Sequence, residues 1–234
     1  MAEEDRSSLE PAVRRRPEAG LSAAEEALVR RCLSPAARTL VAGTGGGRLD
    51  AALADRGFTD LHAVDPDPAD GPRAARLPFP DGHFDQVLQL SELICLLPAA
   101  ADRALAVAEA RRVTRPGGVA VFTFLSHDAG MQGLSARLYG YWLGAVRRAR
   151  GRAPDVQRRP WPGPRRSPAA LLDRRPHAYW WRTEEAAQVL RVSGFAIEGV
   201  GSAAQLERAE LLDAPEQLAA GTADGPLYVV CTPV

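Results

Sequence analysis

The residues best suited to ligand chemistry are a glycine-rich turn at 43–47 and the acid Asp65. An apolar run, Leu40 to Ala42, indicates a buried strand, and the chain then passes directly into Gly43, Thr44, Gly45, Gly46 and Gly47. Glycines let backbone N–H groups approach a ligand, and the N-terminus of the helix expected next favours anionic groups. Asp65 follows a second short strand, where an acid can accept both hydroxyls of a ribose. Turn and acid together predict a nucleotide-type binding site.

The elements expected to position these residues alternate between strands and helices. Ser22-Ala-Ala-Glu25 is a capping-box pattern and predicts a helix to about Leu33. An apolar run from Val87 to Leu97 begins as a strand and continues into a loop or short helix. Further strands are predicted at 61–64, 119–125, 195–200 and 227–232, and helices at 49–57, at 99–114 with a break at 115–118, at 183–193 with Thr183 as the cap, and over most of 204–220. This alternation predicts an α/β fold with a doubly wound, mainly parallel sheet.

Length and composition restrict the class of protein. The 234 residues fit one α/β domain, at 21–234, after a disordered tail at 1–20, with 126–178 as an insertion. The net charge is zero, so the whole molecule has no bias toward nucleic acid or membrane. All 29 basic residues are arginine, which excludes lysine chemistry. The three cysteines are far apart and are expected to be reduced and buried, and we expect no metal site. With no signal peptide or membrane-spanning run, the protein is expected to be cytoplasmic.

Four segments in the same order resemble the class I S-adenosylmethionine-dependent methyltransferases, in their small-molecule branch. The 43–47 turn is similar to the G-x-G-x-G loop of that family, and Asp65 matches its ribose acid. Leu77-Pro-Phe-Pro-Asp-Gly-His-Phe-Asp85 and Glu109-Ala-Arg-Arg-Val-Thr-Arg-Pro-Gly-Gly118 resemble two more specific signatures. The resemblance implies S-adenosylmethionine as cofactor. Its expected contacts are Gly43, Thr44, Gly45, Gly47, Asp65, Pro66, Arg76, Leu77 and Gln89.

The chain departs from the family pattern at both ends of the cofactor. Val41 and Arg73 stand where the family usually has acids, the second of which binds the adenine amino group. Between Asp65 and Leu77 there is no room for the usual third strand and the helix before it. That strand would lie at the edge of the sheet, so the fold is expected to survive its loss. Asp67 or Asp70 can replace the missing adenine acid from the shortened loop.

Methyl transfer needs alignment and exclusion of water more than catalytic side chains, and a base only for some nucleophiles. His127, which follows the 119–125 strand, is the candidate base, and a structural loop histidine is the alternative. His177 is a weaker candidate. Glu92, just past the strand that begins at Val87, is predicted either to contact the cofactor or substrate or to be a solvated loop acid.

The insertion at 126–178 is interpreted as a substrate lid. Tyr139, Trp142 and Tyr179 are predicted to bind substrate. Twelve arginines lie between Arg137 and Arg182 against two acids, so the substrate is expected to be anionic or aromatic. A solvated basic face is the alternative.

The sequence thus predicts methyl transfer from S-adenosylmethionine to an O, N or C nucleophile of a small molecule. The main rival is a scaffold, regulatory partner or other repurposed relative that has lost normal cofactor binding, acting with a protein partner. A third option is a module whose basic segment binds nucleic acid or acidic lipid. Nucleic acid is not expected as a partner, because the net charge is zero and the segment has no RNA-binding motif.

Overall fold

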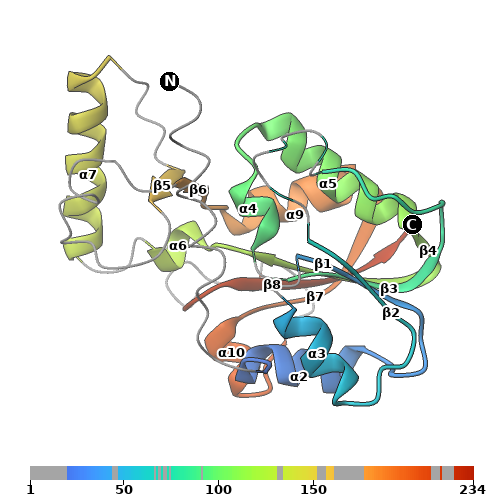
Figure 1. The fold of residues 1–234 in the computed structure, drawn as a ribbon. Helices are drawn as coiled ribbons and strands as arrows, with labels where there is room; N and C mark the ends of the chain where they lie inside the picture. The colour runs from blue at the N-terminus through green and yellow to red at the C-terminus, as the bar shows by residue number, and fades with distance from the viewer. Residues whose placement is uncertain are drawn as a thin grey trace.

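A six-stranded sheet forms the centre of the computed structural model (Figure 1). The structure describes residues 20–43, 47–65, 67, 70, 73, 75–90, 92–130, 134–151, 157–160, 177–211, 217 and 224–234. The predicted tail therefore lies, except for Gly20, outside the described residues. The strands are β1 Thr39–Ala42, β2 Leu61–Val64, β3 Phe84–Gln89, β4 Thr114–Phe124, β7 Phe195–Ser202 and β8 Leu227–Pro233. Their order is β2-β1-β3-β4-β8-β7.

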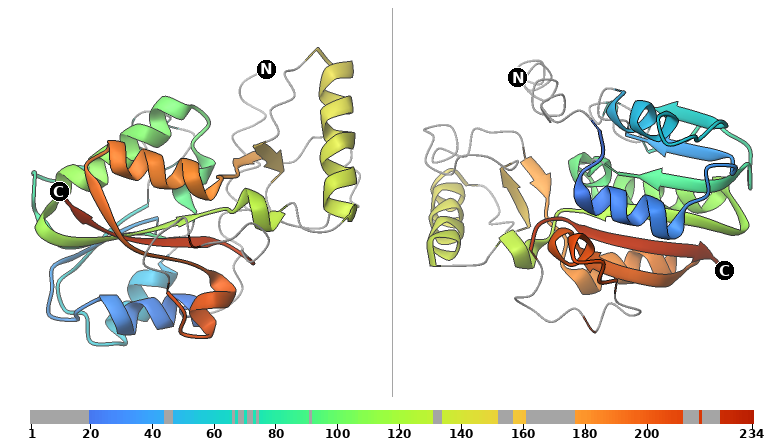
Figure 2. Two further views of the ribbon diagram at one scale, coloured as in Figure 1. Left: turned by 180° about the vertical axis from the view of Figure 1, so that it is seen from behind. Right: turned by 90° about the horizontal axis from the view of Figure 1, so that it is seen from below.

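Within this sheet β1, β2, β3 and β4 pair in parallel, and β8 is antiparallel to both of its neighbours. Helices cover both faces (Figures 1 and 2). One layer holds α2 Ala23–Cys32, α3 Arg48–Ala54 and α10 Ala203–Glu207, and the other holds α4 Leu93–Leu96, α5 Ala100–Val113 and α9 Thr183–Val192. Each face of the sheet buries its own apolar cluster against its helices. The predicted doubly wound, mainly parallel sheet is confirmed.

The edge of the sheet beside β1 is β2, as expected from the short segment that follows it. Between Asp65 and Leu77 the structure describes residues 67, 70, 73, 75 and 76, and none of these is in a strand. They include two tight turns, closed by hydrogen bonds from Asp70 N to Asp67 O and from Arg76 N to Arg73 O. Loss of an outer strand leaves the pairing of β1 with β3 intact, because only one ladder is removed.

Three predicted boundaries are wrong. Strand β4 begins at Thr114, so the Arg115–Gly118 segment belongs to the strand and does not separate it from α5. The N-cap of α9 is Arg182, with Thr183 inside the helix. Helix α10 ends at Glu207, so residues 208–211 are not helical as predicted, and most of the predicted helix beyond them lies outside the described residues. Ala209 adopts a left-handed φ of 61°, and Glu210 N donates to Gln205 O, which together form a Schellman-type end.

The segment predicted to be an insertion forms elements of its own: α6 His127–Gly130, α7 Leu134–Ala149, β5 Arg158–Pro160 and β6 His177–Tyr179. Strands β5 and β6 pair with each other as a separate antiparallel ladder. A bridge between Ser126 and Trp181 attaches the start and the end of the insertion to the end of β4. Helix α7 lies farthest from the sheet, with α6 and the β5–β6 ladder between them (Figures 1 and 2).

Candidate active site

The carboxyl ends of β1 and β2 bring Gly43 and Asp65 side by side. Ala42 pairs with Val64, and Gly43 N donates to Val64 O over 2.8 Å. Asp65 directly follows the last residue of β2 and is exposed. Ligands of open α/β sheets bind at this edge. The predicted turn and the predicted ribose acid therefore share one side of the sheet, as ribose binding requires.

Position 43 requires glycine because of its backbone conformation and its close neighbours. Its φ is +79°, and an added Cβ would lie 3.2 Å from both Leu90 O and Leu93 Cβ. Only a residue without a side chain lets the backbone enter this space. Thr44 and Gly45, which continue the predicted cofactor turn, lie outside the described residues, whereas Gly47 is the N-cap of α3. The packing of Leu90 and Leu93 thus requires glycine at position 43, and its predicted contact with the cofactor stays a prediction.

A buried ion pair supports the far end of the turn. Arg48, the first residue of α3, donates two hydrogen bonds to the Glu25 carboxylate, at 2.9 and 3.0 Å. Glu25 also completes the predicted capping box of α2, since Ser22 N donates to its carboxylate. Burial favours a raised pKa for Glu25, but the hydrogen bonds from Arg48 and Ser22 outweigh it and lower the pKa. The pair joins α2 to α3, next to the N-cap Gly47.

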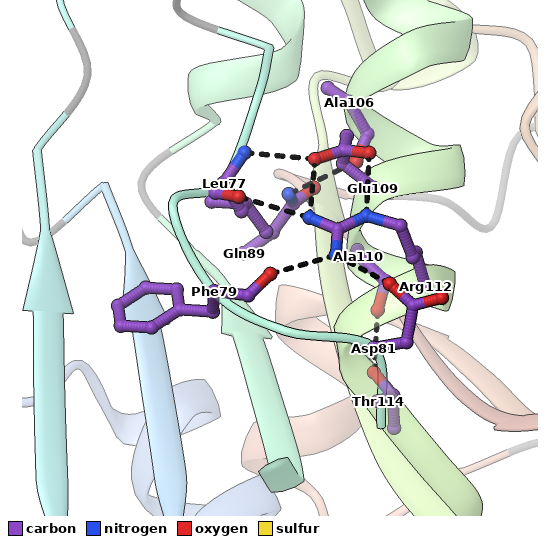
Figure 3. A network of polar contacts seen from close by, with 9 residues as sticks. All are labelled: Leu77, Phe79, Asp81, Gln89, Ala106, Glu109, Ala110, Arg112 and Thr114. Atoms are coloured by element: carbon purple, nitrogen blue, oxygen red, sulfur yellow. Dashed lines mark hydrogen bonds and ion pairs between the residues drawn. The ribbon is translucent and has the colours of Figure 1, made fainter. Parts of the chain in front are cut away.

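The Leu77 segment is held by one arginine of α5 (Figure 3). The Arg112 guanidinium donates to the backbone oxygens of Leu77 and Phe79, to Asp81 and twice to Glu109. Glu109 in turn accepts from Leu77 N at 3.0 Å. All five donor hydrogens of the fork thus have an acceptor. We call these residues, Leu77, Phe79, Asp81, Glu109 and Arg112, the arginine clasp.

The clasp explains why two separated motifs occur together in this sequence. The side chains of Glu109 and Arg112 come from one motif, and the backbone of Leu77 and Phe79 comes from the other. The pKa of Glu109 is lowered, chiefly by its hydrogen bonds with Arg112. The clasp orders the loop whose first residue is predicted to border the adenine. Arg76, also predicted to contact the cofactor, precedes it and is exposed.

Gln89 ends β3 but directs its side chain toward α5. Its Nε2 donates to Ala106 O at 3.4 Å, and its Oε1 is buried without a hydrogen-bond partner among the described residues (Figure 3). A buried acceptor that lacks a donor in the protein is costly. The side chain of Gln89 is thus buried between β3 and α5, and its predicted contact with the cofactor stays a prediction.

His127 begins α6, directly beyond the carboxyl end of β4. Its backbone N donates to Trp181 O, which fixes the residue at the bridge that joins β4 to the insertion. Its Nδ1 is buried without a hydrogen bond among the described residues, and lies 3.6 Å from Asp128 Oδ1. Burial, followed by repulsion from Arg159, lowers the pKa of His127 below its ordinary value. The imidazole is therefore neutral near pH 7 and able to accept a proton.

The predicted substrate residues come from two elements of the chain after β4. Tyr179, on β6, packs its ring 3.7 Å beneath the guanidinium of Arg103 and donates its hydroxyl to Glu185 at 2.6 Å. Tyr139 and Trp142 are on α7, and the substrate role of all three stays a prediction. Arg103, which also donates to Leu97 O and Pro98 O, was not predicted. Its signal in the sequence was an arginine at helical spacing with the apolar residues Ala106, Val107 and Ala110.

The two departures from the family pattern differ in their surroundings. Val41 is fully buried in the apolar cluster of the α2–α3 face, where a carboxylate would lose its hydration. Arg73 is exposed, as are Asp67 and Asp70. Pro66 lies outside the described residues. Glu92 is buried just beyond β3, with a left-handed φ of 54°, so it is not a solvated loop acid.

The comparison with solved structures decides the fold. A methyltransferase from Methanosarcina mazei described as S-adenosylmethionine-dependent matches with a TM-score of 0.60 and 13% identity, over 88% of this chain and 97% of that one. The CcbJ methyltransferase of Streptomyces caelestis matches with a TM-score of 0.57 and 14% identity, over 91% and 95%. This chain has the class I methyltransferase fold.

Two further comparisons accord with the methyltransferase fold. A family model described as a methyltransferase domain matches residues 70–122, which include the clasp. The 1,6-didemethyltoxoflavin-N1-methyltransferase of Burkholderia thailandensis, whose structure holds S-adenosylhomocysteine, matches with a TM-score of 0.51 and 15% identity, over 95% of this chain and 78% of that one. A search of curated proteins gave no match. The resemblance to S-adenosylmethionine-dependent methyltransferases is thus confirmed.

The described part of the chain also bears on the membrane and metal predictions. It contains no helix long and apolar enough to cross a bilayer. Nor does it hold a group of three or more His, Cys, Asp or Glu side chains arranged for a metal ion. Cys95 and Cys231 are buried free thiols, as predicted, and Cys32 is half-buried.

Proposed function

We propose that this protein transfers a methyl group from S-adenosylmethionine to an O, N or C nucleophile of a small molecule in the cytoplasm. The observation that carries the proposal is the placement of Gly43 and Asp65 on adjacent strand ends. Backbone groups of the turn would hold the methionine end of the cofactor, and Asp65 would accept the ribose hydroxyls. Leu77, positioned by the clasp, would border the adenine.

The cofactor would supply an electrophilic methyl group on its sulfonium. The contribution of the chain is to hold donor and acceptor in line and to exclude water. His127 would accept the proton of an alcohol, phenol or protonated nitrogen, and its neutral imidazole suits that role. Arginines of the insertion favour an anionic substrate, since Arg159 is buried and acts electrostatically on His127.

Calorimetric titration with S-adenosylmethionine and S-adenosylhomocysteine tests the cofactor assignment. We expect micromolar dissociation constants for the native chain. Asp65→Ala should weaken binding by roughly ten- to a hundredfold, because a hydrogen bond to a charged group contributes about 1.5–3 kcal/mol. Asp55→Ala is the matched control, since Asp55 is an exposed acid at the opposite end of α3. Equal affinity of the Asp65→Ala protein and the control would contradict the ribose assignment.

The pH dependence of turnover tests His127. A base must be deprotonated to act, so kcat/KM should fall on acidification by roughly tenfold per pH unit below the pKa of His127. Because that pKa is lowered, the decline is expected to begin below the ordinary histidine range. A profile measured from pH 4.5 to 8 should lose this acidic limb in His127→Gln, while S-adenosylmethionine affinity stays unchanged. An identical limb in the variant would assign the proton transfer to another group.

The rival proposal is that the protein retains the fold but does not catalyse methyl transfer. The buried Val41 favours it, because the family acid is replaced by a well-packed apolar side chain. This proposal requires the absence of binding at millimolar S-adenosylmethionine. In that case the search would turn to a protein partner.

A further inference from the structure

Helix α7 has an apolar stripe on the side that faces away from the rest of the protein. Leu134, Leu138, Tyr141 and Trp142 are 73%, 58%, 76% and 50% exposed. The spacing i, i+4, i+7, i+8 places them on one helix face. Ala136, Leu143 and Arg147, on the opposite face, are buried. The helix is therefore anchored through one face and presents a second apolar face to solvent.

This stripe is unusual for the molecule. Apart from these four, only Val192 and Val234 are large apolar residues exposed to this degree among the described residues. Isolated exposed apolar side chains are ordinary, but a contiguous patch on one helix indicates a binding surface. Leu134 to Trp142 extends about 12 Å along the helix axis, at about 1.5 Å per residue.

The charged side chains of α7 itself are all positive. Between Asp128 and Asp155 the sequence has no acid, and α7 and the residue after it carry Arg137, Arg147, Arg148 and Arg150. Arg137 and Arg148 lie four residues before and seven after Tyr141, so they border the stripe. The net charge of the chain is zero, so this positive charge is local. An apolar centre bordered by arginines is complementary to acyl chains beneath anionic headgroups.

We propose that α7 lies in the interface of an anionic phospholipid membrane and holds the protein there peripherally. Leu134 and Leu138 would enter the acyl boundary, Tyr141 and Trp142 would occupy the headgroup level, and Arg137 and Arg148 would contact phosphates. Helix α7 lies at the outer end of the molecule, beyond the carboxyl edge of the sheet (Figures 1 and 2), and its apolar stripe is exposed.

Other occupants fit the helix less well. A protein groove that wraps an amphipathic helix needs more of its circumference, and the Ala136–Leu143 side is already buried. A second copy of this chain would place like-charged arginines opposite one another. An RNA would use the arginines but would leave the two leucines without a role. This inference does not depend on the proposed methyl transfer, and its test needs neither cofactor nor substrate.

Co-sedimentation with lipid vesicles tests the proposal. The purified full chain is mixed with vesicles of phosphatidylcholine alone or of phosphatidylcholine with one third phosphatidylglycerol. We expect binding to the anionic vesicles that weakens in roughly 0.5 M salt, where exposed charges are screened. Leu138→Asp should lower the partition coefficient at least about tenfold, since it removes an apolar contact and adds an unfavourable charge. Val192→Asp, which changes an exposed apolar residue of α9, should bind like the native chain.

Arg137→Gln combined with Arg148→Gln should weaken binding to anionic vesicles, while the exposed control Arg30→Gln should not. Thermal unfolding of every variant shows that the fold is retained. Equal binding to both vesicle types, or unchanged binding of Leu138→Asp, would overturn the proposal. Two other results would also overturn it. The first is that the native chain forms a dimer and Leu138→Asp dissociates it. The second is that the chain binds RNA but not vesicles, and Leu138→Asp leaves the RNA binding unchanged.

Discussion

Replacing Arg112 with alanine is expected to lower the free energy of unfolding by about 2–4 kcal/mol. The substitution removes five hydrogen bonds. Glu109 keeps its bond from Leu77 N and Leu77 O keeps its bond from Phe79 N, but Phe79 O loses the Arg112 donor. For a chain of this size the thermal midpoint should fall by roughly 5–12 °C. Arg112→Lys should lose part of this stability, because an ammonium cannot reproduce the planar fork.

Arg208→Ala provides the matched control, since Arg208 is an exposed arginine paired with one acid, Glu210. Its expected effect on the free energy of unfolding is small, because the ion pair is exposed and solvent screens it. Denaturant unfolding of Arg112→Ala, Arg112→Lys and Arg208→Ala gives the three changes in the free energy of unfolding on one scale. If Arg112→Ala were no more destabilising than Arg208→Ala, the clasp would have no structural importance.

Acidification gives an independent measure of the same clasp. The lowered pKa of Glu109 means that its ionised form is favoured in the folded state. Its stabilisation is therefore complete above the unfolded-state pKa, ordinarily about 4.5, and is lost as the pH falls through the lower folded-state pKa. In Arg112→Ala this part of the pH dependence should be reduced.

Gly43→Val is expected to destabilise the fold by about 3 kcal/mol and to abolish cofactor binding. A left-handed φ of +79° costs a non-glycine residue about 1–2 kcal/mol, and more for a β-branched one. The added atoms would also press on Leu90 O and Leu93, which are close to the Cβ position already. A displaced turn would no longer present its backbone to the cofactor.

Gly57→Val separates the two costs of Gly43→Val, which are the unfavourable backbone conformation and the crowding of the side chain. Gly57 has a φ of +86°, but nothing lies within 4 Å of an added Cβ. It should therefore show the conformational cost without crowding and retain cofactor affinity. Unfolding in denaturant and calorimetric titration provide the comparison. Native-like affinity in Gly43→Val would show that the turn after β1 does not hold the cofactor.

The parts of the fold that carry local signals were predictable from the sequence. Ser22 and Glu25 form a capping box by contacts within four residues, and the apolar run before Gly43 can only be buried as a strand. The absence of space between Asp65 and Leu77 likewise predicted the shortened edge of the sheet. In each case the residues that decide the structure are neighbours in sequence.

The remaining features depend on contacts that local sequence does not encode. Alanine has no preference for a left-handed φ, so nothing marked Ala209 as the end of α10. The clasp joins Leu77 to Arg112 only when the sheet brings their segments together. Similarly, the composition of the insertion indicated aromatic and basic residues, but only the packing of Ala136 and Leu143 shows that Trp142 faces outward.

The place of β8 in the sheet has a consequence for synthesis on the ribosome. Among the described strands β8 comes last in the chain, yet it lies between β4 and β7. Until residues 227–233 leave the exit tunnel, the long apolar strands β4 and β7 each present an unpaired edge. Such edges are templates for aggregation. A nascent chain stalled before Leu227 should therefore recruit chaperones, and release from them should coincide with insertion of β8.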